Sequence, residues 1–154
     1  MSSPGAARRI LACAALFPLA ACGADAVRVA PPTPPASIAV MCHTLRERLP
    51  AKLAGQARRA TSPDSPLVTA WGTPAIAQRC GVPRPAALRP TAELATLDGV
   101  SWFAEPPNRP VTFTAVNRRA YVEVTIPPKY TPSSDVLLDL ATPIKTALPA
   151  SAEG

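Results

Sequence analysis

The residue types that hydrolases use occur close together in the first half of the chain. His43, Ser62, Asp64 and Ser65 provide a base, an orienting acid and two hydroxyl nucleophiles. Neither serine lies in a Gly-x-Ser-x-Gly turn, and each is followed by proline, as in ordinary turns. The carboxylates in the middle of the chain are scattered rather than paired, which does not suit glycoside hydrolysis. These features favour a protein without catalytic residues and keep a small hydrolase as the alternative.

Arginines surround a tryptophan in the same half of the chain. Arg58, Arg59, Arg79 and Arg84 flank Trp71 in the sequence. Guanidinium groups bind carboxylate or phosphate through paired hydrogen bonds, and an indole ring offers an apolar stacking surface. We therefore predict an anion-binding site formed by these five residues. The alternative is that the arginines are surface charges or structural ion pairs and that the tryptophan belongs to the core.

The first 21 residues have the pattern of an export signal. Arg8 and Arg9 precede an apolar run over residues 10–21. A helix of that length spans about 18 Å, less than the roughly 30 Å of a bilayer core, so the run is too short for a transmembrane anchor. The run ends in Leu-Ala-Ala-Cys, which resembles the lipobox of bacterial lipoproteins and implies cleavage before Cys22 and a lipid on its thiol. The alternative is an ordinary secretory signal, in which Cys22 has no special role.

Two cysteines remain in the part of the chain that folds. An exported protein folds in an oxidising compartment, where a pair of cysteines is normally bridged. We therefore predict a disulfide between Cys42 and Cys80. The alternative is a metal site that also uses His43, but an adjacent Cys-His pair lacks the usual ligand spacing. No metal and no cofactor is predicted.

A proline-rich stretch separates the signal from the folded part. Residues 30–36 read Ala-Pro-Pro-Thr-Pro-Pro-Ala, which favours extended polyproline II. We expect residues 22–36, beginning with the acylated cysteine, to form a semi-rigid stalk that lifts the domain off the membrane. The folded domain is predicted over residues 37–149 and a disordered tail over residues 150–154.

Helical and strand patterns both occur in the folded part. Apolar residues at every fourth position predict a first helix over about 41–53, which Pro50 ends or kinks. A short helical segment is expected over 91–97 and a last helix over 134–148, capped by Ser133 or Ser134. Since these helices flank strands, the predicted fold class is α+β, a small antiparallel sheet with helices from the two ends of the folded part.

Strands fill the middle of the folded part. The clearest signal is a hairpin, because apolar and polar residues alternate on both sides of Asn117-Arg118-Arg119. Residues 58–66 are polar and contain prolines, so a loop is expected there, and Asp98-Gly99 is expected to form a turn. The expected strands are residues 67–71, 75–80, 100–103, 111–116 and 120–126.

Several short segments, taken in order, resemble the DUF3515 family. They are Arg58-Arg59-Ala60-Thr61-Ser62-Pro63-Asp64-Ser65-Pro66, Ala70-Trp71-Gly72-Thr73-Pro74-Ala75-Ile76, Arg79-Cys80-Gly81-Val82-Pro83-Arg84-Pro85, Asp98-Gly99-Val100-Ser101-Trp102 and Ala120-Tyr121-Val122-Glu123-Val124. The resemblance covers about residues 41–149. It implies an exported or membrane-tethered protein of actinobacteria with a domain that can hold a disulfide, and it carries no established activity.

Composition narrows the function classes further. The chain has 154 residues and 21 prolines, so it is neither a multidomain enzyme nor a bundle of long helices. Its net charge is +6, and between Arg46 and Arg89 it has eight basic and two acidic residues. Such a region suits anionic surfaces, while export and the lack of interleaved aromatic residues exclude nucleic acid. We expect a lipid-anchored protein on the extracytoplasmic face of the cell membrane. Its expected partners are the membrane and either an anionic envelope polymer or a membrane protein, with a cell-envelope hydrolase as the alternative.

Overall fold

The computed structural model describes Met1 and residues 25–108 and 111–151. The predicted acylation site Cys22 lies outside these residues, as does all of the predicted signal peptide after Met1. The elements follow one another in the order β1 (Val27–Arg28), α1 (Ala36–Arg48), β2 (Lys52–Leu53), β3 (Gln56–Arg59), β4 (Thr61–Ser62), β5 (Val68–Trp71), β6 (Ile76–Val82), β7 (Ala95–Leu97), β8 (Val100–Glu105), β9 (Thr112–Ala115), β10 (Tyr121–Thr125) and α2 (Ser133–Ala147).

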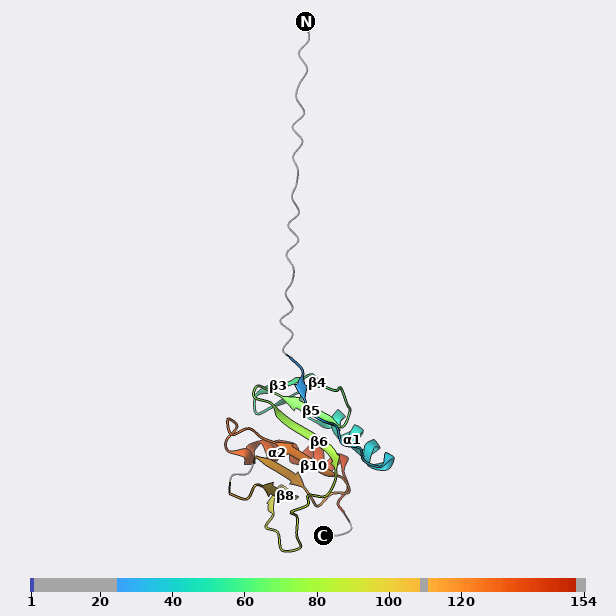
Figure 1. Cartoon of the computed structure of the whole chain (residues 1–154), viewed down its shortest axis with the longest axis vertical. Helices are drawn as coiled ribbons and strands as arrows, with labels where there is room; N and C mark the ends of the chain where they lie inside the picture. The colour runs from blue at the N-terminus through green and yellow to red at the C-terminus, as the bar shows by residue number, and fades with distance from the viewer. Residues whose placement is uncertain (2–24, 109–110, 152–154) are drawn as a thin grey trace.

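Eight of the strands form one antiparallel sheet. Their order across the sheet is β2-β3-β5-β6-β10-β9-β8-β7, and β1 pairs separately with β4 in parallel. The two helices contact each other, and they contact the sheet through β6, β7 and β8 (Figure 1). The predicted α+β class, with helices from the two ends of the folded part, is therefore confirmed.

One hydrophobic core fills the space between the helices and the sheet. Val122 and Val124 of β10 are buried, while the residues between and beside them are only partly covered, as the alternating pattern predicts. On α2 the spacing of three and four residues puts one apolar stripe against the sheet. That stripe consists of Leu137, Leu140, Ile144 and Leu148, all of them buried in the core. The predicted hairpin and last helix are thus both confirmed.

The helices differ from the sequence expectations in four places, the first being that the N-terminal helix begins at Ala36 rather than near residue 41. The first helix stops at Arg48, because Leu49 precedes a proline and takes an extended conformation, so that Leu53 lies in β2. Neither serine at the start of α2 caps it, since Pro132 occupies the N-cap position and no side-chain cap bond forms there. The short helix predicted over 91–97 is wrong, because residues 95–97 pair with β8 as an edge strand.

The predicted loop over residues 58–66 is also wrong in part. Arg58 and Arg59 belong to β3 and pair with Trp71 and Ala70 of β5. A tight turn at Ala54 and Gly55, both with positive φ, joins β2 to β3 and returns the chain to the sheet. Polar residues can form such a strand because β3 lies near the sheet edge, where one side remains open to water.

The proline-rich segment lies against the domain. Val27 N donates to Ala60 O at 2.9 Å, Val29 N donates to Ser62 O at 3.2 Å, and the Arg79 side chain donates to Ala30 O at 3.0 Å. Gly81 has a positive φ and no side chain, and this leaves room for Pro34 directly above it. Residues 27–34 therefore do not form the free stalk that the prolines predict.

The beginning of the predicted C-terminal tail is bound as well. Ala150 forms an isolated antiparallel bridge with Arg118, and Ser151 N donates to Asn117 O at 3.2 Å. Backbone pairing with the β9–β10 turn thus continues to residue 151, beyond the predicted domain end at residue 149.

Candidate functional site

Arg58 binds the C-terminal end of α1. Its guanidinium donates to three backbone carbonyls, Arg46 O at 3.1 Å, Leu49 O at 2.5 Å and Pro50 O at 3.1 Å. The last carbonyls of a helix lack partners within the helix and carry partial negative charge. The β2–β3 turn brings Arg58 back to these carbonyls, and the side chain is fixed there.

Arg59, the next residue, is fixed in a similar way. Its guanidinium donates to Gly72 O at 3.2 Å and to the Thr73 hydroxyl at 2.9 Å, and it also donates to Asp25 O. All three acceptors are uncharged. Arg59 therefore joins the first described residues of the chain to the β5–β6 turn, and none of these partners carries a negative charge.

The other two predicted arginines lie elsewhere. Arg79 forms an ion pair with Glu123 at 2.9 Å across β6 and β10, as the structural alternative predicts. Arg84 donates to Leu88 O within the β6–β7 loop. The structure therefore does not bring the four predicted arginines together in one site.

A cleft at the β3 end of the sheet does bring three arginines together. It has a volume of about 320 Å³, and Arg46, Arg58, Arg59 and Asp64 are among the residues that line it. The single carboxylate, Asp64, lies 3.6 Å from Arg46, and its side chain is 86% exposed. Arg46 also donates to Ser65 O at 2.5 Å. We call Arg46, Arg58 and Arg59 the arginine cluster.

The positive charge of the arginine cluster is only partly compensated. The ion pairs among the described residues are Arg46–Asp64, Arg79–Glu123 and Lys145–Asp98, so Arg58 and Arg59 have no acidic partner there. Burial lowers the pKa of Arg58 below its usual range, and the nearby charge of Arg46 lowers it further. A bound anion would offset this repulsion, while backbone carbonyls already hold all three guanidinium groups in place.

Trp71 is a core residue. Its side chain is fully buried, and its Nε1 donates to Pro50 O at 3.0 Å. The Arg58 guanidinium lies over the ring, 6.0 Å from its centroid. The indole therefore supports Arg58 and offers no open stacking surface, in agreement with the alternative prediction for this residue.

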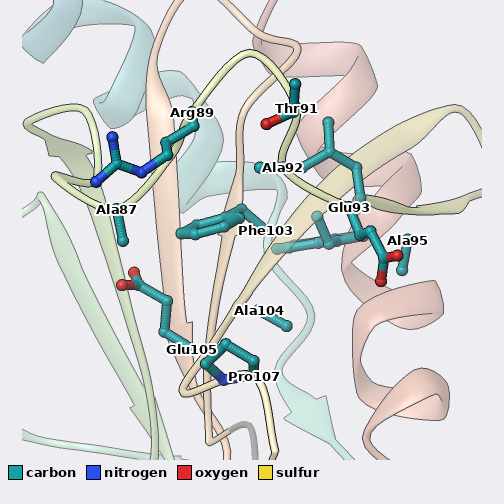
Figure 2. Close-up of a pocket in the computed structure, with 12 residues that line it drawn as sticks. Ala87, Arg89, Thr91, Ala92, Glu93, Ala95, Phe103, Ala104, Glu105 and Pro107 are labelled. Carbon is teal, nitrogen blue, oxygen red and sulfur yellow. The ribbon is translucent and has the colours of Figure 1, made fainter.

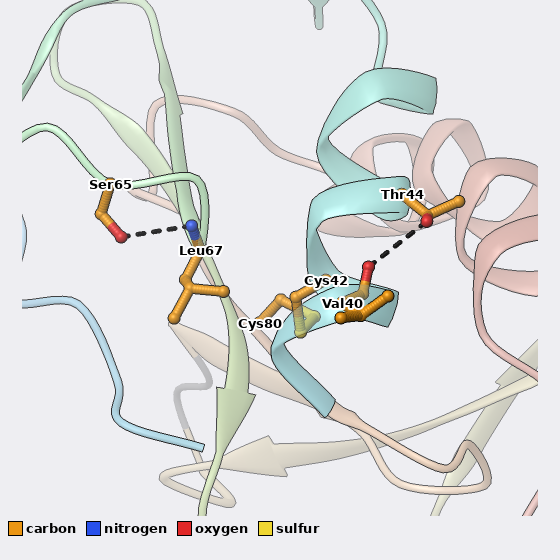
Figure 3. Close-up of a disulfide and its surroundings, with 6 residues drawn as sticks. All are labelled: Val40, Cys42, Thr44, Ser65, Leu67 and Cys80. Atoms are coloured by element: carbon orange, nitrogen blue, oxygen red, sulfur yellow. Dashed lines mark hydrogen bonds between the residues drawn. A yellow bond between two sulfur atoms is a disulfide. The ribbon is translucent and has the colours of Figure 1, made fainter. Parts of the chain in front are cut away.

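The predicted disulfide between Cys42 and Cys80 is confirmed. Figure 3 shows it joining α1 to β6, and both half-cystines are 1% exposed. Arg46 follows Cys42 by one helical turn, so both residues lie on the side of α1 that faces the sheet. The disulfide thus fixes the helix that carries one member of the arginine cluster.

The residues of the hydrolase alternative do not converge. His43, Ser62 and Asp64 are exposed, and His43 forms no hydrogen bond with either serine or with the aspartate. Ser65 is buried and its hydroxyl accepts a hydrogen bond from Leu67 N at 3.2 Å, within a turn (Figure 3). None of these side chains forms a nucleophile–base pair in the part of the chain that the structure describes.

A larger, more apolar cleft lies at the opposite end of the sheet. It has a volume of about 620 Å³ and is formed by the β6–β7 loop and β8. Figure 2 shows the Phe103 ring at its centre, with Arg89 on the loop above and Glu105 on the strand below. No ion pair joins these two charged residues. The cleft therefore combines apolar walls with charges of both signs.

Two further features are absent from residues 25–108 and 111–151. No group of three or more His, Cys, Asp or Glu side chains in these ranges is arranged to hold a metal ion. No helix within the same ranges has the length and apolar character needed to cross a bilayer.

Arg46 is the site residue that the sequence prediction missed. It belongs to the basic stretch, but its contact with β3 depends on where α1 ends and on the tight β2–β3 turn. The available signal was its position four residues after Cys42, which puts it on the side of the helix bound to β6.

Comparison with known protein families shows which family the chain matches. A family model described as "Protein of unknown function (DUF3515)" matches residues 7–152, which is nearly the whole chain. No curated protein and no solved structure matches the chain.

Proposed function

The chain belongs to the DUF3515 family, whose description states no function, so we propose a role from the residues of the chain itself. We propose that the protein is a lipid-anchored, extracytoplasmic envelope protein that binds an anionic group and performs no catalysis. The observation that carries the binding role is the arginine cluster. Three guanidinium groups line one cleft, and a single exposed carboxylate is the only acid among them. Phosphate and carboxylate are the groups that such side chains bind best.

The anchoring part of the proposal rests on the sequence. A short basic start, an apolar run and Leu-Ala-Ala-Cys22 together favour export and lipidation. The disulfide fits the same compartment, because such bonds persist where the surroundings are oxidising. The mass of the mature protein tests this part. A diacylglycerol on an N-terminal Cys22 is expected, and an unacylated N-terminus would contradict it.

The binding part is tested by titration with a short poly(glycerol phosphate), followed by calorimetry. Arg46→Gln removes one charge from the cleft and should weaken binding about tenfold, the value of one lost charge-assisted contact. Arg119→Gln is the matched control, because Arg119 is exposed and its side chain has no partner in the described residues. The control should bind within about twofold of the wild type.

A second variant separates binding from folding. Asp64→Asn removes the one carboxylate of the cleft, and because this side chain is 86% exposed the fold should be unaffected. Binding should tighten severalfold, whereas Asp139→Asn, the same charge change on the exposed face of α2, should have no effect. Equal affinities for all four variants and the wild type would contradict a binding role for the cluster.

A further inference from the structure

The first described residues of the chain are fixed at one end of the domain. Asp25 O accepts a hydrogen bond from Arg59, and β1 pairs in parallel with β4. Figure 1 shows the chain entering the domain beside β3 and β4, at the end opposite β8. The entry point and the arginine cluster therefore share one end of the molecule.

The distance from this end to the predicted lipid is short. Three Cα–Cα steps of 3.80 Å separate Cys22 from Asp25, so the two residues are at most about 11 Å apart. This upper limit is about one and a half Debye lengths at physiological ionic strength, where the Debye length is roughly 8 Å. We call the end of the domain that carries the paired strands β1 and β4 the β1–β4 end. A lipid on Cys22 would thus hold this end at the headgroups, without the stalk that the proline-rich sequence predicts.

Charge is distributed unevenly along the same direction. The β1–β4 end carries Arg28 and Lys52 in addition to the arginine cluster, against Asp25 and Asp64. The opposite edge carries Glu93 and Glu105 with Arg89. Six strand-to-strand steps of about 4.8 Å separate β3 from β7, so the second edge lies about 29 Å away and beyond the reach of the headgroup charge.

We infer that the β1–β4 end of the domain faces the membrane that holds the lipid, and that the cleft at the arginine cluster takes the phosphate of an anionic phospholipid. This inference rests on the proposed anchor and anion site and gives that site its ligand. Three observations carry it: the entry point of the chain, the short link to Cys22 and the positive cleft beside that entry point. An anionic headgroup would then be supplied at high local concentration by the anchor itself.

The test uses the full acylated protein in vesicles that contain a nitroxide on the headgroup of a trace lipid. Single cysteines at Ser62, near the entry point, and at Thr91, at the opposite edge, carry a fluorophore, and both positions are exposed. In vesicles with phosphatidylglycerol, the probe from Ser62→Cys should be quenched at least threefold more than the probe from Thr91→Cys. Equal quenching at both positions, or stronger quenching at Thr91, would overturn the orientation.

The lipid specificity is tested in the same vesicles. In pure phosphatidylcholine, or with Arg46→Gln, the preferential quenching at Ser62 should fall by half or more, while Arg119→Gln should leave it unchanged. Quenching that is indifferent to phosphatidylglycerol and to Arg46 would overturn the headgroup ligand.

The outcomes also separate this inference from the proposed function. If poly(glycerol phosphate) binds and depends on Arg46 while the vesicle results show no orientation, the inference is wrong and the proposed function stands. If neither probe binds through Arg46, both are wrong. A missing acyl group on Cys22 would remove the anchor and, with it, the inference.

Discussion

Arginine side chains in this protein hold chain segments together, and some of them do so without an acidic partner. Arg58 and Arg59 donate almost entirely to backbone carbonyls, which hold the guanidinium groups without neutralising them. Arg79, by contrast, has Glu123 as a full ionic partner. From the sequence alone, all of these arginines are equally good candidates for an anion-binding site. Whether a guanidinium group finds a carbonyl or a carboxylate depends on which chain segments the fold brings close, and the sequence does not show this.

At this scale we predict that Arg58→Lys destabilises the domain although it keeps the charge. A lysine ammonium is a single point donor and does not reproduce the planar fork that reaches three carbonyls. The loss should be about 1.5–3 kcal/mol, the range for hydrogen bonds that involve a charged group. Urea unfolding measures it, with Arg119→Lys as the control, which should unfold like the wild type. An unchanged midpoint for Arg58→Lys would mean that the three carbonyls do not need this partner.

The elements differ in how far the sequence predicts them. The β9–β10 hairpin and α2 follow from period-two and three-to-four-residue patterns, because each buries one clear apolar face. The strands β3, β4 and β7 do not, since they have two to four residues, bury no clear apolar face and are held mainly by backbone pairing with their neighbours. The same limit applies to the site. The position of Arg58 over the end of α1 follows from the β2–β3 turn, and no local pattern around Arg58 predicts that contact.

Gly81 provides a test of the docked proline segment. A Cβ at this position would lie 2.7 Å from Pro34 Cγ, so Gly81→Ala should push residues 30–35 away from the sheet. Amide exchange at Val27 and Val29 should then speed up, because their bonds to β4 depend on the docked chain. Gly55→Ala is the matched control, since Gly55 has a similar positive φ but open space around it. It should lower stability by about 1 kcal/mol or more, through backbone strain alone, without affecting these two amides specifically. Equal exchange in both variants would contradict the contact.

In the whole molecule, the disulfide is the covalent link between the helical layer and the sheet. Cys42 and Cys80 are 38 positions apart, so their bond closes a long loop of the unfolded chain. Replacing both by alanine should cost roughly 4 kcal/mol in the chain-entropy view. The free energy of unfolding in urea measures this cost, and the wild type in reductant should approach the double variant. A loss below about 1 kcal/mol would show that noncovalent packing of α1 on β6 suffices.

The connection of this bond to the parallel β1–β4 pair has a mechanical consequence. A force applied to the chain before Asp25 would first load the backbone bonds that join residues 27–29 to residues 60–62, and then the contacts of the prolines and the first turns of α1. The load would reach Cys42 and pass through sulfur directly into β6, at the centre of the sheet. Fully extended, the 17 residue steps from Asp25 to Cys42 would reach at most about 60 Å, and this sets the upper limit of the chain released before any strand of the eight-stranded sheet had to separate. Under tension, the segment before Cys42 would therefore extend while the sheet stayed folded. The arginine cluster would lose the bond from Arg59 to Asp25 O and keep its hydrogen bonds to carbonyls outside this segment.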